Sequence, residues 1–148
     1  MKSKLFMMAF ALVALAITGC GKEEPSSNNL ATKILGDWHY ASKEYDVDVY
    51  VTFNADSTFE EYQRLGEGRY RLYIGTWTMK GSELNGVYSD GVNWGSSYKV
   101  SFAGDTMTLI ATNKSAETLT YTKESVPETV KQSAIEPFDV RSVDIRWF

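Results

Sequence analysis

Leu35-Gly36-Asp37-Trp38 and the later stretch Phe53-Asn54-Ala55-Asp56-Ser57-Thr58-Phe59 are the most informative parts of this sequence. The later stretch carries turn chemistry, because Asn and Asp tolerate unusual backbone angles and hydrogen-bond their own main chain. Before the turn, apolar residues alternate with polar ones from Val47 to Phe53. A period of two is typical of a half-buried β-strand. These features predict an antiparallel hairpin that follows shortly after Trp38.

The same alternation recurs along the chain and predicts eight strands. They fall within residues 37–42, 47–53, 58–65, 70–79, 83–88, 94–102, 107–111 and 119–121. No helix-length insertion separates neighbouring strands, which excludes parallel α/β folds. A sandwich and an up-and-down barrel remain, and the run of short turns favours the barrel, which has no exposed edges. The predicted fold is therefore all-β: an eight-stranded antiparallel barrel over residues 34–124, followed by a short C-terminal helix and tail.

Residues 125–148 are predicted to form that helix and tail, packed on the barrel. Ser125 can cap the helix, Pro127 suits its first turn, and Glu128 can complete a capping box. Val130 and Ala134 are expected to face the sheet. Alternation over residues 143–147 predicts either a final strand or a segment lying over the outside of the barrel.

The N-terminus has the pattern of a signal peptide over residues 1–19. Two lysines precede an apolar run, Leu5 to Ile17, whose thirteen residues are too few to span a bilayer. Ile17-Thr18-Gly19-Cys20 resembles the bacterial lipobox, which implies cleavage before Cys20, acylation of its thiol and attachment to a membrane. The alternative is an ordinary secretory signal that leaves Cys20 as a free thiol.

Residues 20–33 are predicted to be a lipidated cysteine and a flexible tether, with a short helical turn between Asn28 and Leu35. Gly21-Lys22-Glu23-Glu24 looks like the signal that sends some bacterial lipoproteins to the outer face of the cell. Its alternative reading is a solvated tether. The expected location is the bacterial cell envelope, as an outer-membrane lipoprotein, with display on the cell surface as the further expectation.

Several short motifs in order resemble small bacterial lipocalin-like lipoproteins. Leu35-Gly36-Asp37-Trp38 looks like the lipocalin Gly-x-Trp signature, and residues 53–59 are similar to a Phe-x-x-Asp-Gly-Thr hairpin, with Ser57 in place of Gly. Gly75-Thr76-Trp77 and the stretch from Gly104 to Leu109 match the family's middle strand and late hairpin. The resemblance covers roughly residues 34–148 and implies a calycin-type barrel whose interior can hold one small ligand.

Composition excludes some classes of partner. The formal charge is -4 with no block of basic residues, which argues against nucleic acid. One cysteine permits no intramolecular disulfide. The sequence identifies no protein partner.

Catalytic and metal-binding patterns are weak. His39 is the only histidine and lies at an outward position, so we interpret it as a surface residue. A Gly-x-Ser-x-Gly elbow and a glycine-rich phosphate loop are missing from the sequence. Alternation places Glu60 and Glu61 on opposite faces. We expect no enzyme activity, cofactor or metal, with an uncharacterised hydrolase as the low-ranking alternative.

The inward positions supply the candidate ligand site. Polar groups in a dry core are costly, whereas in a cavity they meet water or ligand. The predicted ligand-binding residues combine aromatic and polar side chains: Tyr40, Glu61, Gln63, Tyr73, Trp77, Tyr88, Trp94 and Tyr98. The ligand expected is a small apolar or amphipathic molecule. A barrel filled solidly by its aromatic residues is the open alternative.

A rival hypothesis treats the barrel as a scaffold for interactions with a protein or glycan, including inhibition of a hydrolase. It depends on three aromatic residues expected to be exposed, namely Tyr50, Trp147 and Phe148.

Overall fold

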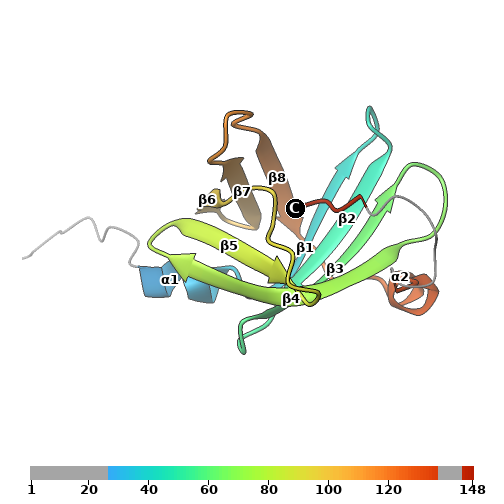
Figure 1. Cartoon of the computed structure of the whole chain (residues 1–148), viewed down its shortest axis with the longest axis horizontal. Coiled ribbons are helices and arrows are strands. Elements are labelled where there is room, and N and C mark those ends of the chain that lie inside the picture. Colours follow the sequence, from blue (N-terminus) through green and yellow to red (C-terminus); the bar gives the residue numbers. More distant parts are fainter. Residues whose placement is uncertain (1–26, 137–144) are drawn as a thin grey trace, which may run out of the picture.

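A computed structural model of the chain describes residues 27–136 and 145–148 (Figure 1). The predicted signal peptide and Cys20 lie outside these residues. Eight strands close into an antiparallel barrel in sequence order, with β8 returning to β1. The predicted up-and-down barrel is therefore confirmed. The strands are β1 (Gly36–Ser42), β2 (Val47–Phe53), β3 (Thr58–Leu65), β4 (Arg71–Lys80), β5 (Glu83–Tyr88), β6 (Tyr98–Ala103), β7 (Thr106–Ala111) and β8 (Thr118–Lys123).

Helix α1 (Ser27–Lys33) and Trp38 close one end of the barrel, which we call the floor. The Trp38 indole is 2% exposed and donates its Nε1 hydrogen to the carbonyl of Ile34 at 2.7 Å. Lys123 Nζ lies 4.5 Å from the centre of that ring and donates to the carbonyl of Leu35. Gly36 has φ 103, a left-handed conformation that favours glycine. The Gly-x-Trp stretch thus turns the chain from α1 into the barrel.

The opposite end, which we call the mouth, is surrounded by the connections 43–46, 66–70, 89–97 and 112–117. Two neighbouring strand pairs of the barrel, which we call the seams, are paired only near the floor. β1 pairs with β8 at only Trp38↔Lys123 and His39↔Thr122, and β5 pairs with β6 at only two positions near the floor. The strands on either side of each seam therefore separate toward the mouth.

The connection between β5 and β6 covers one of these seams. Its Trp94 donates its backbone hydrogen to the carbonyl of Gly86 at 3.0 Å, and the indole lies against Gly86, where a β-carbon would come within 2.1 Å of Trp94 Cε2. The predicted strand over residues 94–102 is wrong at its start, because β6 begins at Tyr98. Trp94 and Ser96 belong to the connection, where the indole fills space that a paired strand would have filled.

Helix α2 (Glu128–Ser133) packs on the outer face of the barrel. Val130 lies in a second apolar cluster with Tyr50, Tyr62 and Val126, and Ala134 packs against it, as the sequence predicts. Tyr50, expected to be exposed, is therefore only 6% exposed. Alternation identified its outward face correctly, but the helix covers that face.

The predicted Ser125 cap is wrong, because Pro127 is the N-cap and no side chain caps α2. The preceding chain is bonded to β1 instead. Glu124 N–H donates to the Asp37 carbonyl, and Val126 N–H donates to the Asp37 carboxylate at 3.2 Å. These bonds attach the chain that leads into α2 to Asp37 of β1, and Ser125 is left exposed. None of the helices in the described part of the chain is long and apolar enough to span a membrane.

Replacing Val130 with Ala is expected to lower the free energy of unfolding by about 2 kcal/mol, because it removes buried methyl groups from the contact between α2 and the barrel. Chemical denaturation measures the change. Lys131→Ala is the matched control on the exposed face of the same helix and is expected to change stability by less than about 0.5 kcal/mol. Equal effects of the two substitutions would contradict a stabilising contact at Val130.

Candidate functional site at the barrel mouth

The mouth contains a segment of the chain itself, residues 145–148, which we call the inner segment; Figure 1 marks its end with C. The Phe148 ring stacks on Trp94 at 4.2 Å between centroids and 18° between planes, and meets Tyr98 edge-on at 5.7 Å. Trp147 packs against Tyr40 at 5.1 Å. For residues 145–147 the prediction of a final strand or an outer segment is therefore wrong, and residues 143–144 lie outside the described residues. At the mouth, the two aromatic side chains of this segment pack against aromatic rings of the barrel.

Side chains of the barrel bond the main chain of the inner segment. The Gln63 amide donates to the carbonyl of Ile145 at 2.5 Å and accepts from the N–H of Trp147 at 2.8 Å. Phe148 N–H donates to the Tyr88 hydroxyl oxygen at 3.3 Å, and Trp147 Nε1–H donates to the Tyr121 hydroxyl at 2.8 Å. Phe148 is consequently buried and Trp147 is half-buried, contrary to the expectation that both are exposed.

An ion pair holds the inner segment at the rim. Both Nη atoms of Arg146 donate to the carboxylate of Asp90, and the guanidinium lies 4.6 Å from the centre of the Tyr88 ring. The hydrogen bond from Arg146 lowers the pKa of Asp90 to about 2. This bidentate geometry is the strong form of a carboxylate–guanidinium contact. Asp90 is exposed on the connection between β5 and β6, so this ion pair meets solvent.

Two buried polar atoms in the interior have no hydrogen-bond partner among the described residues. One is Glu61 Oε1 and the other is Trp94 Nε1. Glu61 is 0% exposed, and burial raises its pKa to about 8, although the Tyr88 hydroxyl 3.4 Å from Oε2 acts in the opposite direction. A carboxyl with this pKa is mainly protonated at neutral pH. A desolvated polar atom without a partner costs about 1–3 kcal/mol, a cost that a hydrogen bond from a bound molecule would recover.

The structure brings together seven of the eight predicted ligand-binding residues around the inner segment: Tyr40, Glu61, Gln63, Tyr73, Tyr88, Trp94 and Tyr98. Trp77 is not among them. It lies toward the floor, where its Nε1 hydrogen is donated to the Thr58 carbonyl at 3.0 Å and its ring meets Phe53 edge-on. Alternation specifies the inward face but not the position along the barrel axis, which explains this difference.

Sequence reasoning missed Arg146, which lies at the rim of the mouth. Its partner Asp90 lies on the connection between β5 and β6. The available signal was the run Arg146-Trp147-Phe148, whose two large aromatic residues are costly to leave in solvent.

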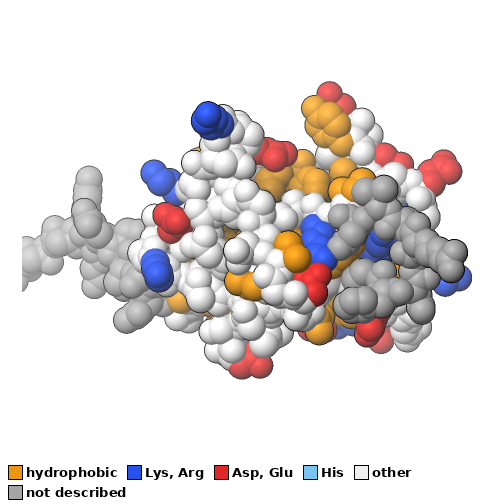
Figure 2. Space-filling view, in the orientation of Figure 1, with side chains coloured by type: hydrophobic (Ala, Val, Ile, Leu, Met, Phe, Trp, Pro, Cys, Tyr) orange, Lys and Arg blue, Asp and Glu red, His pale blue; other side chains and the backbone are white. Residues whose placement is uncertain are grey.

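A pocket of about 310 Å³ remains beside the inner segment, lined by residues that include Gln63, Arg71 and Ile145. On the face shown in Figure 2, acidic and basic side chains are interspersed and hydrophobic atoms gather between the hairpins at the mouth.

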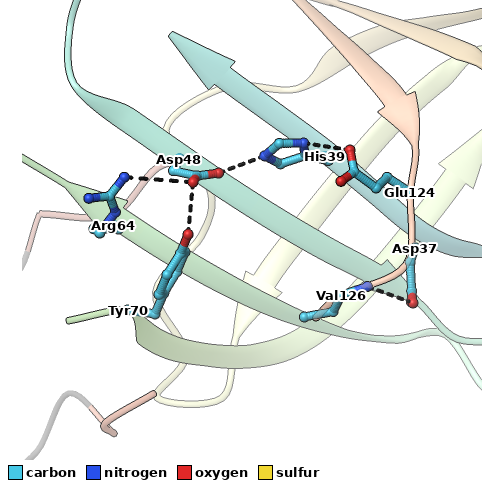
Figure 3. A network of polar contacts seen from close by, with 7 residues as sticks. All are labelled: Asp37, His39, Asp48, Arg64, Tyr70, Glu124 and Val126. Carbon is cyan, nitrogen blue, oxygen red and sulfur yellow. Dashed lines mark hydrogen bonds and ion pairs between the residues drawn. The ribbon is translucent and has the colours of Figure 1, made fainter. Parts of the chain in front are cut away.

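A polar network lies on the outer face, away from the mouth interior (Figure 3). The His39 ring sits between two carboxylates, with Nε2 2.6 Å from Asp48 Oδ1 and Nδ1 2.8 Å from Glu124 Oε2. It also stacks on Tyr50 at 4.1 Å. Asp48 accepts a further hydrogen bond from the Tyr70 hydroxyl at 2.8 Å. His39 is thus more enclosed than its predicted surface position implied, with its side chain 19% exposed, and it ties β1 to β2 and to the chain after β8.

No group of three or more His, Cys, Asp or Glu side chains within residues 27–136 and 145–148 could hold a metal ion. The described chain forms a closed eight-stranded up-and-down barrel. One end is closed by α1 and Trp38, and the other is a mouth lined by aromatic residues. This is the architecture of a calycin-type binding protein.

A lipocalin-like domain profile matches residues 22–109, and the chain belongs to the lipocalin-like domain family. The matched range ends within β7, so β8, α2 and the inner segment lie beyond it. Comparisons with curated proteins and with solved structures gave no match. A lipocalin-like barrel indicates small-molecule binding in general, and this fold typically binds rather than catalyses.

Proposed function

We propose that this protein binds one small apolar or amphipathic molecule in the mouth of its barrel and has no catalytic activity. The observation that carries the proposal is the pair of buried, unpartnered polar atoms, Glu61 Oε1 and Trp94 Nε1, within an interior lined by aromatic rings. Aromatic surface with a few convergent polar groups is the usual composition of a small-molecule site.

The hydrogen-bonding chemistry of these two atoms limits the chemical class of ligand that can bind. Trp94 Nε1 can only donate a hydrogen bond, so the ligand must place an acceptor there. Glu61, with a pKa of about 8, offers a neutral carboxyl that donates or accepts at neutral pH. Tyr73 and Tyr88 add apolar ring surface nearby. An uncharged aromatic molecule with at least one polar group fits this combination.

Fluorescence titration with the uncharged aromatic dye phenylnaphthylamine tests the proposal. We expect saturable binding, and we expect Trp94→Phe to weaken it about tenfold, because the smaller phenyl ring offers the dye less stacking area than the indole. Trp77→Phe, at the floor, is the matched control and is expected to leave affinity within about twofold. Non-saturable fluorescence, or equal loss in both variants, would count against a site at the mouth.

We further propose that the protein is an outer-membrane lipoprotein of a bacterial envelope, held by lipid on Cys20. The support is the lipobox-like Ile17-Thr18-Gly19-Cys20 after a short apolar run. Incorporation of labelled palmitate into the full chain, compared with Cys20→Ser, tests acylation. Protease treatment of intact cells then tests whether Gly21-Lys22-Glu23-Glu24 directs the protein to the outer face.

The rival hypothesis of an envelope interaction module has lost its motivating observation. It depended on exposed Tyr50, Trp147 and Phe148, and the structure covers Tyr50 with α2 and places the other two in the mouth. Small-molecule binding is therefore the function that the site supports best.

A further inference from the structure

The inner segment occupies the site to which the proposed function assigns a ligand, and the inference below rests on that function. We propose that the inner segment, residues 145–148, is an internal competitor: it fills the ligand site in the free protein and is displaced when a ligand binds. The segment and the ligand would then use the same surfaces, chiefly Trp94, Gln63 and Tyr88.

The first argument is topological. The barrel closes with β1 to β8 alone, and the inner segment takes no place in the strand order. Its main chain is held by the side chains of Gln63 and Tyr88 at residues 145, 147 and 148. Withdrawal of the segment therefore breaks side-chain contacts and leaves the ladder of the barrel closed.

The second argument concerns how the segment is held. Its stack of Phe148 on Trp94 at 4.2 Å is the contact that any flat aromatic ring could make at this place. Its ion pair at the rim involves an Asp90 side chain that is 32% exposed, so water and salt reach the pair and can screen it. Both contacts are of kinds that a competing molecule can replace or outweigh.

The third argument is the incomplete fit of the segment. It leaves Glu61 Oε1 and Trp94 Nε1 without hydrogen bonds, although both atoms are buried beside it. A ligand that stacks on Trp94 and also bonds these atoms gains interactions that the segment does not make. The two unpartnered atoms thus give a ligand its advantage over the segment.

Competition has a measurable consequence. When only a fraction of the molecules have an open site, the apparent dissociation constant is the intrinsic constant divided by that fraction. The segment would therefore set how much ligand is needed to load the barrel.

The test compares the full chain with a variant that lacks residues 145–148, using phenylnaphthylamine as the probe. We expect the shortened variant to bind the dye at least about tenfold more tightly. A synthetic peptide Ile-Arg-Trp-Phe, added in trans, is expected to displace the dye from the shortened variant. Circular dichroism and thermal unfolding first establish that this variant is folded.

A full-length variant keeps the inference testable if the shortened chain does not fold. Arg146→Ala removes the ion pair with Asp90 and is expected to tighten dye binding about threefold to tenfold, because the segment leaves the mouth more often. Lys114→Ala, an exposed residue on another connection at the mouth, is the matched control and is expected to leave binding unchanged.

The outcomes separate this inference from the proposed function. Equal dye affinity in the full and shortened chains would overturn competition while leaving small-molecule binding intact. If no variant binds the dye but the peptide binds the shortened chain, the displaceable segment is supported and the small-molecule function fails. If neither dye nor peptide binds a folded shortened chain, both are overturned.

Discussion

Replacing Glu61 with Gln is expected to raise the free energy of unfolding by a few kcal/mol at pH 8–9 and to remove much of its dependence on pH. Burial holds the carboxyl pKa at about 8 in the folded protein, against 4.5 ordinarily. Between these values the unfolded chain has lost the proton and the folded chain keeps it. The neutral carboxyl therefore contributes fully to the free energy of unfolding below pH 4.5. This contribution decreases as the pH rises from 4.5 toward 8, and it is lost above pH 8.

Urea denaturation of both proteins at pH 5, 7 and 9 measures this effect, whose limiting slope is about 1.4 kcal/mol per pH unit. The amide preserves shape and can accept from the Tyr88 hydroxyl, so packing changes little. Glu60→Gln, at the outward-facing position next to it on β3, is the matched control and is expected to leave the pH profile unchanged. Parallel profiles for the natural protein and Glu61→Gln would show that Glu61 does not carry a raised pKa.

Replacing Gly86 with Ala is expected to destabilise the protein by several kcal/mol, because its methyl group would lie 2.1 Å from Trp94 Cε2. The indole cannot stay in the seam between β5 and β6 at that separation. Its departure also ends the stack on Phe148 and the edge contact with Phe59 at 5.2 Å. The substitution therefore disrupts the wall of the barrel and the mouth together.

Thermal unfolding and tryptophan emission measure these changes, and emission is expected to shift to longer wavelength as an indole enters water. Gly95→Ala is the matched control on the same connection. Nothing lies within 4 Å of a β-carbon at Gly95, so we expect no loss of stability beyond about 0.5 kcal/mol. A stable Gly86→Ala variant with unshifted emission would mean that the indole is not confined by Gly86.

Local patterns were sufficient to predict the barrel. Alternation assigns each residue of a strand to one face, and short turns leave no room for a crossover, so eight strands in sequence order close most simply on themselves. The same logic placed Glu61 and Gln63 inside, next to aromatic residues, and the structure agrees. Membrane anchoring, location and the ligand remain predictions from the sequence.

Long-range contacts decided what the site contains. Alternation predicts that Tyr50 points outward, but it does not predict that α2 covers Tyr50. It predicts that Trp77 points inward, but it does not predict that Trp77 lies at the floor. It likewise could not place Phe148 against Trp94, because that stack joins residues more than fifty positions apart whose meeting depends on the open seam between β5 and β6. The sequence therefore specified a barrel with an inward-facing set of aromatic and polar side chains. Only the tertiary structure showed that the chain's own last four residues fill its mouth, since burial of their rings depends on surfaces assembled from several distant strands.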